Sequence, residues 1–170
     1  KTELTDLTQV MEKLSSEAFV DKSKMSLFGA SQGGVVASLY AASYPDRVHK
    51  LLLIFPAFVL FDDAKETYRE LGSPDFDQLP DSLTHHNATL GKIYLIDALG
   101  IDIQSELAKI TAPTLIIHGT DDAVVPYQYA VEASQTIPNA ELVTVEGGEH
   151  RIDERFAITA APAIQKFLKE

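Results

Sequence analysis

Three residues in this sequence have the types and the spacing needed for nucleophilic attack on a carbonyl group. Ser31 lies at the centre of Gly29-Ala-Ser-Gln-Gly33, and Asp122 and His150 follow it in that order along the chain. In such a set the histidine acts as general base toward the serine hydroxyl, and the aspartate orients the histidine and stabilises its charged form. We therefore predict a catalytic triad of Ser31, His150 and Asp122 that works through an acyl-enzyme.

The residues around the serine predict a strand, a tight turn and a helix. The hydrophobic run that ends at Phe28 predicts a buried parallel strand, and the run from Val35 predicts a helix packed on the sheet. We interpret Gly29 and Gly33 as positions where strand and helix approach too closely for side chains. The turn directs the first helical N–H groups toward a developing negative charge, so we assign the backbone N–H of Gln32 to the oxyanion hole. A glycine-rich turn with a capping serine is the alternative for this motif alone.

The other two residues lie in loops that follow predicted strands. The run 115–118 leads into His118-Gly-Thr-Asp-Asp, and the run 142–145 leads into Glu146-Gly-Gly-Glu-His150. The carboxyl ends of parallel strands share one edge of a sheet, where such folds bind ligands. Asp121 and Asp122 compete for the carboxylate role, and we choose the second because the Ala-Val-Val-Pro that follows packs back into the fold. Glu149 is a third candidate, and we expect His118 to be a structural hydrogen-bonding residue.

The hydrophobic pattern along the rest of the chain predicts a single α/β domain over residues 1–170, with a mainly parallel sheet flanked by helices. Helices are expected at 4–18, from Val35 to about Tyr44, with Pro126 near the first turn of the next one, and at the end of the chain to about Leu168. A further buried strand is expected at 50–56. Residues 57–110 are less regular and predict an inserted lid, with an acidic helix at 63–71 and an apolar stretch at 93–99.

Composition limits the classes of partner. The chain has 170 residues, no cysteine and a formal net charge of −11, which disfavours nucleic acids and anionic lipids as partners. The adjacent His85 and His86 have no third ligand at metal-binding spacing, so we expect neither a metal nor another cofactor. We expect a soluble, cytoplasmic protein with a small-molecule ester as substrate and no membrane partner.

At these residues the sequence resembles the α/β-hydrolase superfamily, and more narrowly the bacterial feruloyl (cinnamoyl) esterases with a small inserted lid. The narrower resemblance is carried by five segments: Gly29-Ala-Ser-Gln-Gly-Gly, Phe55-Pro-Ala with the acidic helix after it, Leu79-Pro-Asp, Leu90-Gly-Lys-Ile-Tyr94 and His118-Gly-Thr-Asp-Asp.

The resemblance implies a carboxylic ester hydrolase that acts on small aromatic esters. It also implies that Asp63 and Tyr94 hold the phenolic end of the substrate. A lid glutamine of the family is Glu70 here, and the histidine usually found before the serine is Ala30. The alternatives are a peptidase or lysophospholipase of the same fold, or an inactive hydrolase domain that serves as an interaction module.

The resemblance also implies further strands before the first helix, including a loop that donates the second oxyanion-hole N–H. We therefore expect this sequence to be the C-terminal portion of the fold, with the strand near Met25 left at an apolar edge. A homodimer, or association with the missing N-terminal segment, is expected to cover that edge.

Overall fold

The computed structural model describes residues 2–85 and 88–169. The chain divides into two compact units. The first, called the sheet unit below, comprises residues 1–58 and 104–170, and the second, called the lid unit, comprises residues 59–103. Each unit is described by itself.

The sheet unit is built on four strands: β1 (Leu27–Ala30), β2 (Leu51–Ile54), β5 (Thr114–Gly119) and β6 (Ala140–Val145). They are hydrogen-bonded in the order β1-β2-β5-β6, and every neighbouring pair is parallel. Parallel neighbours need crossover connections, and the connection from β2 to β5 contains the whole of the lid unit. The predicted fold class, a mainly parallel sheet flanked by helices, is confirmed.

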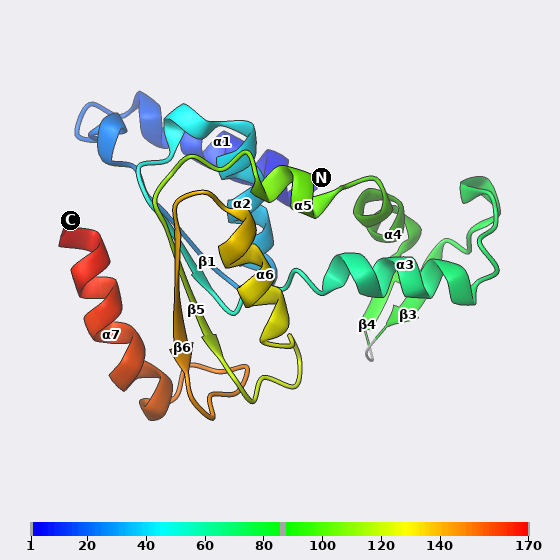
Figure 1. Ribbon diagram of the computed structural model, residues 1–170. Coiled ribbons are helices and arrows are strands. Elements are labelled where there is room, and N and C mark those ends of the chain that lie inside the picture. Colours follow the sequence, from blue (N-terminus) through cyan, green and yellow to red (C-terminus); the bar gives the residue numbers. More distant parts are fainter. Residues whose placement is uncertain (1, 86–87, 170) are drawn as a thin grey trace. The chain divides into compact units, whose positions relative to one another are not determined.

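Helices cover both faces of the sheet. Figure 1 shows α7 (Glu154–Lys169) along one face and α2 (Gln32–Ser43) and α6 (Gln128–Thr136) along the other. The first helix, α1 (Thr2–Ser16), packs against α2. Short helical segments occupy Lys22–Lys24, Pro45–Arg47 and Ile103–Leu107, the last of these being α5. The carboxyl ends of the strands are therefore free to carry loops.

The core lies where the two central strands meet α7. All residues of β2 and β5 are buried, as expected for strands covered on both faces. One cluster on the α7 face comprises Leu52, Ile54, Phe55, Leu115, Ile117, Val145, Phe156, Ala160 and Phe167.

The prediction of a fully buried strand near Met25 is wrong in one respect. Leu27 is buried, but Phe28 is 59% exposed. The reason is that β1 is at the end of the strand order, so its side chains alternate between a covered and an open position. The predicted homodimer, or association with an N-terminal segment at this edge, stays a prediction.

The lid unit contains two packed helices and a small antiparallel sheet. The helices are α3 (Leu60–Glu70) and α4 (Lys92–Leu99), and a short helical segment covers Phe76–Gln78. The strands β3 (Ser82–His85) and β4 (Ala88–Gly91) pair antiparallel. Sequence patterning predicted the acidic helix of residues 57–110, but it gave 93–99 only as an apolar stretch, which is helix α4 in the structure, and it did not predict these strands. They are short and polar, so they lack the hydrophobic alternation that marks a strand.

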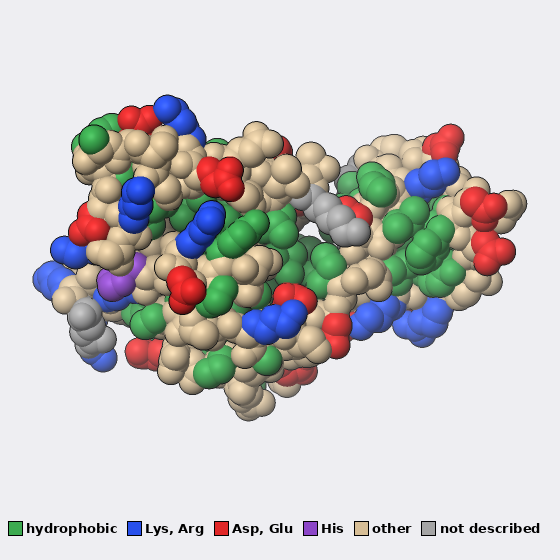
Figure 2. Space-filling model, turned by 90° about the horizontal axis from the view of Figure 1, so that it is seen from above, with side chains coloured by type: hydrophobic (Ala, Val, Ile, Leu, Met, Phe, Trp, Pro, Cys, Tyr) green, Lys and Arg blue, Asp and Glu red, His purple; other side chains and the backbone are tan. Residues whose placement is uncertain are grey.

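The surface carries both signs of charge. On the face shown in Figure 2, Lys and Arg side chains are interspersed with Asp and Glu side chains, although the net charge of the chain is −11. Among the described residues, no helix has both the length and the apolar character needed to cross a bilayer.

Candidate active site

Ser31 occupies the turn between β1 and α2 with a backbone that L-residues rarely adopt. Its φ is 52° and its ψ is −126°, a conformation that costs free energy and persists only where neighbouring contacts hold it. The Ser31 N–H donates to the Ile54 carbonyl at 3.0 Å, and the Ser31 carbonyl accepts from the N–H groups of Gly34 and Ala57, each at 3.0 Å. These bonds to the end of β2 and to α2 fix the serine at the carboxyl edge of the sheet.

The glycines around the turn differ from the sequence interpretation. A Cβ on Gly29 would lie 2.4 Å from the Gly33 carbonyl oxygen, so this position does require glycine. A Cβ on Gly33 would meet no atom within 4 Å, and the interpretation of Gly33 is therefore wrong. The close approach occurs one residue later, where a Cβ on Gly34 would lie 2.9 Å from Cβ of Pro56. Helix α2 turns Gly34, rather than Gly33, toward the chain that leaves β2.

The structure brings Ser31, His150 and Asp122 into one row of hydrogen bonds. His150 Nε2 lies 3.0 Å from Ser31 Oγ, and His150 Nδ1 lies 2.7 Å from Asp122 Oδ2. The two ring nitrogens therefore face a hydroxyl and a carboxylate, the arrangement in which an imidazole can accept a proton from one side while it is stabilised from the other.

The carboxylate of Asp122 is held by the backbone of its own loop. Its Oδ1 accepts from the N–H groups of Val124 at 2.9 Å and Val125 at 2.8 Å, which leaves Oδ2 for the histidine. Asp122 is only 5% exposed, and Val125 is buried, so the loop does turn back into the fold. Charge-assisted bonds from backbone N–H groups are among the stronger hydrogen bonds and keep the carboxylate in one orientation.

The two competing carboxylates lie elsewhere. Asp121 is exposed and accepts from the Thr120 hydroxyl at 3.1 Å. Glu149 is exposed and forms an ion pair with Arg151 at 3.3 Å. The structure therefore brings Asp122, and neither of these two, to His150.

The ring of Phe55 packs on the imidazole of His150, a contact that sequence reasoning missed. The two ring centroids are 4.4 Å apart, and the rings are tilted by 47°. Phe55 has a φ of 35°, and its N–H donates to the Ile117 carbonyl at 2.8 Å. The turn after β2 thus presents a flat apolar surface to the histidine. The available signal was an aromatic residue directly before Pro56 at the end of a strand.

Gln32, the predicted oxyanion-hole residue, is the first residue of α2. The N–H groups of the first helical turn lack intrahelical partners, and the helix dipole places partial positive charge there. The side-chain amide of Gln32 donates to both carboxylate oxygens of Glu3, at 2.8 and 3.0 Å, and this holds α1 to the start of α2. The backbone N–H lies next to the Ser31 turn because Gln32 directly follows Ser31.

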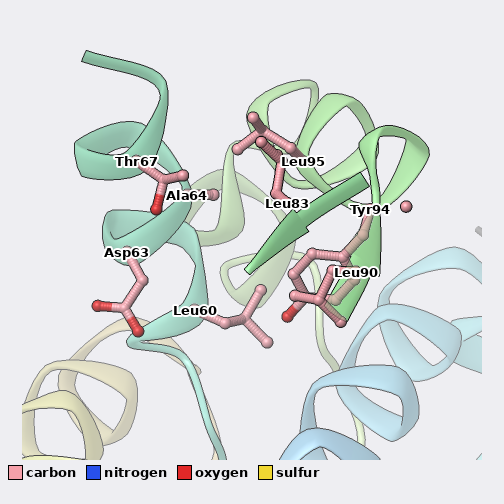
Figure 3. Close-up of a pocket in the computed structure, with 9 residues that line it drawn as sticks. Leu60, Asp63, Ala64, Thr67, Leu83, Leu90, Tyr94 and Leu95 are labelled. Carbon is pink, nitrogen blue, oxygen red and sulfur yellow. The ribbon is translucent and has the colours of Figure 1, made fainter. Parts of the chain in front are cut away.

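The lid unit contains a small pocket. Figure 3 shows its walls, with Asp63 on α3 and Tyr94 on α4, and both side chains are half-buried. The other residues that line it are mostly apolar: Leu60, Ala64, Thr67, Leu83, Leu90, Gly91 and Leu95. Aliphatic walls with two polar groups are typical of a small-molecule site.

The histidine pair named in the sequence is described only in part. His85 is the last residue of β3, and His86 lies outside the described residues. Within the described ranges, no group of three His, Cys, Asp or Glu residues is arranged to hold a metal ion.

Known proteins resemble this chain over nearly its whole length. The model of the prolyl oligopeptidase family matches residues 1–170. The solved structure of Est1E from Butyrivibrio proteoclasticus aligns with a TM-score of 0.84 and 30% identity, and the alignment covers 98% of this chain and 70% of that one. A second structure of Est1E contains bound ferulic acid.

Curated relatives are aligned over smaller shares of their own sequences. A poly(3-hydroxyalkanoate) depolymerase from Ectopseudomonas oleovorans is 27% identical over 89% of this chain and 63% of its own length. YisY, an AB hydrolase superfamily protein of Bacillus subtilis, is 29% identical over 73% of this chain and 59% of its own length. The chain thus spans less than two thirds of these curated relatives. Its fold is that of the α/β hydrolases, it resembles esterases within that fold, and it belongs to the prolyl oligopeptidase family.

Proposed function

We propose that this protein is a serine carboxylesterase that forms an acyl-enzyme at Ser31. The observation that carries the proposal is the hydrogen-bonded row in which His150 Nε2 lies 3.0 Å from Ser31 Oγ and His150 Nδ1 lies 2.7 Å from Asp122 Oδ2. A serine hydroxyl is a weak nucleophile until an adjacent base accepts its proton. Histidine in this position supplies that base, and the buried carboxylate fixes which ring nitrogen carries the hydrogen.

The proposed reaction has two steps. In the first, Ser31 Oγ attacks the ester carbonyl while His150 Nε2 accepts the hydroxyl proton, and the same histidine then gives this proton to the departing alcohol. In the second, water attacks the acyl group by the same proton path and releases the acid. The backbone N–H of Gln32, at the start of α2, stabilises the oxyanion in both steps.

We propose small aromatic esters of the cinnamoyl or feruloyl type as substrates. Two observations support this choice: the apolar pocket of the lid unit with Asp63 and Tyr94 in its walls, and the likeness to Est1E, which binds ferulic acid. In this proposal the aliphatic walls contact the aromatic ring, and the two polar side chains bind its phenolic hydroxyl. We propose the cytoplasm as the compartment.

The proposal is tested by labelling the purified protein with a fluorophosphonate and mapping the modified peptide. We expect one label on Ser31, and no label in Ser31→Ala or His150→Ala. A label on another residue, or none in the unchanged protein, would remove the triad and favour an interaction module. The hydrolysis of methyl ferulate by the labelled protein is then compared with that by the unlabelled protein. The fraction of activity lost should equal the fraction of protein that is labelled.

A peptidase is the second candidate, because the matching family is that of prolyl oligopeptidase. Acyl transfer from an ester and from an amide uses the same triad, so the site alone favours neither. Matched substrates separate the two candidates: methyl ferulate against a proline-containing peptide anilide, at equal concentrations. We expect ester cleavage to dominate, and a preference for the anilide would replace the esterase by the peptidase.

A further inference from the structure

His118 is a buried imidazole that the proposed reaction does not use. It lies near the end of β5 and is 0% exposed. The rings of Phe55 and Tyr127 meet it edge-on, with centroids at 6.5 and 5.9 Å. A polar side chain excluded from water in this way needs partners inside the protein.

Two oxygen atoms determine which of its nitrogens carries the hydrogen. His118 Nε2 lies 2.9 Å from the Val125 carbonyl oxygen and 3.2 Å from Asp122 Oδ2. A carbonyl and a carboxylate only accept hydrogen bonds, so Nε2 must be the donor. The remaining nitrogen, Nδ1, is buried and has no hydrogen-bond partner among the described residues.

The lone Nδ1 indicates that the ring stays neutral. Protonation would place a second N–H on the buried Nδ1, for which the described residues offer no acceptor. Burial lowers the pKa of His118 below its ordinary value, and this effect outweighs the Val125 carbonyl and the Asp122 carboxylate, which raise the pKa. The nearby His150 lowers it further. The remaining polar neighbour, Tyr127, directs its hydroxyl to Thr144 at 2.5 Å.

The contacts of His118 close a ring around the carboxylate. The N–H of Val125 donates to Asp122 Oδ1, the carbonyl of the same residue accepts from His118, and His118 Nε2 also contacts Asp122 Oδ2. Asp122 Oδ2 is therefore held between two imidazoles, with His118 Nε2 at 3.2 Å and His150 Nδ1 at 2.7 Å. Both ends of the turn from Asp122 to Val125 are fixed by the same side chain.

We propose that His118 is a positioning residue, whose Nε2–H holds the Asp122 carboxylate in the orientation that receives His150. This inference rests on the proposed function, because it assigns His118 a part in preparing Asp122 and His150 for catalysis. The ring touches neither Ser31 nor the substrate in this proposal, and it acts through Asp122. A neutral donor suits this role, because a cation beside the carboxylate would compete with the charged form of His150.

Two variants test the proposal, His118→Leu and His118→Gln. Leucine fills much of the space and removes the donor, whereas the glutamine amide can place an N–H close to the former Nε2 position. The first readout is the low-field proton NMR resonance of the His150 Nδ1–H that bonds to Asp122, which needs no substrate. We expect this resonance to shift or broaden in His118→Leu and to be retained in His118→Gln.

The second readout is turnover of methyl ferulate. We expect kcat to fall about tenfold in His118→Leu with KM unchanged, and to recover in His118→Gln. An unchanged resonance and kcat in His118→Leu, with only a lower melting temperature, would show that His118 is merely structural. If the unchanged protein fails to hydrolyse any ester, the proposed function fails, but the resonance still tests the link from His118 to His150.

Nitrogen NMR of the unchanged protein provides a test that does not depend on the folding of a variant. We expect the ring of His118 to carry its hydrogen on Nε2 and to stay neutral at pH values where an exposed histidine is already charged. A His118 ring that carries its hydrogen on Nδ1, or that titrates like an exposed histidine, would overturn the proposal.

Discussion

The strand ends of the sheet unit and the pocket of the lid unit hold their polar groups in different ways. Asp122 is 5% exposed, and two backbone N–H groups fix one of its carboxylate oxygens. Ser31 is fixed through its own main chain, which bonds to Ile54, Gly34 and Ala57. In the lid unit, Asp63 on α3 and Tyr94 on α4 are half-buried side chains in the walls of a pocket that is otherwise mostly aliphatic.

Under the proposed function, this difference separates the residues of the reaction from those of substrate recognition. Where the backbone holds a catalytic group, its geometry cannot change without disturbing the sheet, and the same reaction follows whatever the substrate. Where side chains on helices line a pocket, one substitution can change the preferred ligand and leave the fold intact. We therefore expect substitutions at the strand ends to lower turnover of every ester, and substitutions in the lid pocket to alter the order of preference among esters.

The largest effect is expected for Asp122→Asn. The neutral amide lacks the negative charge that stabilises the His150 imidazolium when it donates a hydrogen bond to this residue. We therefore expect kcat to fall by about 10⁴-fold for aromatic and alkyl esters alike. The matched control is Asp121→Asn, one residue away and exposed, which should change kcat by about twofold or less. Steady-state kinetics on both ester classes measure the two losses. A reversed order of the two variants would assign the carboxylate role to Asp121.

The next effect concerns the backbone of the serine turn. In Gly29→Ala the new Cβ would lie only 2.4 Å from the Gly33 carbonyl oxygen. The strand must therefore move away from α2. We expect the free energy of unfolding to fall by about 3 kcal/mol, as urea titration would measure.

Gly33→Ala is the control for this prediction. The position is open and lies in the first turn of α2, where alanine favours the helix by up to about 1 kcal/mol over glycine. Equal destabilisation by the two substitutions would mean that the close approach of strand and helix is not what selects Gly29.

The sequence predicted the buried strands and the loops that follow them. Hydrophobic runs located the parallel strands, and the loops after them contain the aspartate and the histidine that the structure brings to Ser31. Such patterns can be read locally, because a buried strand must be apolar and a ligand-binding loop must leave it at the carboxyl end. The assignment of catalytic roles to these residues stays a prediction.

Contacts between distant segments were not predictable in the same way. Gly34 is constrained by Pro56, and Phe55 packs on His150, although neither pair is close in sequence. Such contacts depend on how the strands are ordered in the sheet, which a single sequence does not specify. The pairing of β3 with β4 was missed for a different reason, because the strands are short and lack the alternation of a half-buried sheet.

A smaller, substrate-dependent effect is expected for Tyr94→Phe in the lid pocket. The variant keeps the ring among the leucine side chains and removes only the hydroxyl, so the pocket should not collapse. Loss of one hydrogen bond to a phenol should raise KM for methyl ferulate about fivefold. The matched substrate is methyl cinnamate, which lacks the phenolic hydroxyl and should show no change. Equal changes for the two esters would remove Tyr94 from phenol recognition.

The smallest effect that we predict is a difference in how each unit loses stability as the pH falls. Asp153 precedes α7 in the sheet unit, and its carboxylate accepts from the Phe156 N–H at 2.9 Å. This hydrogen bond, helped by Arg151 and Arg155, holds the pKa of Asp153 below its ordinary value, and burial opposes it only in part. A carboxyl whose pKa is lower in the folded state stabilises the protein above its unfolded pKa. This contribution is lost as the pH falls through the folded pKa.

Asp153→Asn removes that titration and keeps the cap, since asparagine accepts from the same N–H about as well. Urea unfolding between about pH 6 and about pH 3 should therefore show a shallower loss of stability for Asp153→Asn than for the unchanged protein, with similar values near neutral pH. Asp81 offers the comparison in the lid unit, because its hydrogen bond and ion pair with Lys92 lower its pKa in the same direction. Asp81→Asn should alter the acid response of the lid unit, measured by hydrogen exchange of α4, and leave α7 unchanged. If Asp153→Asn and the unchanged protein lost stability in parallel, the cap of α7 would be insensitive to the charge of its carboxyl.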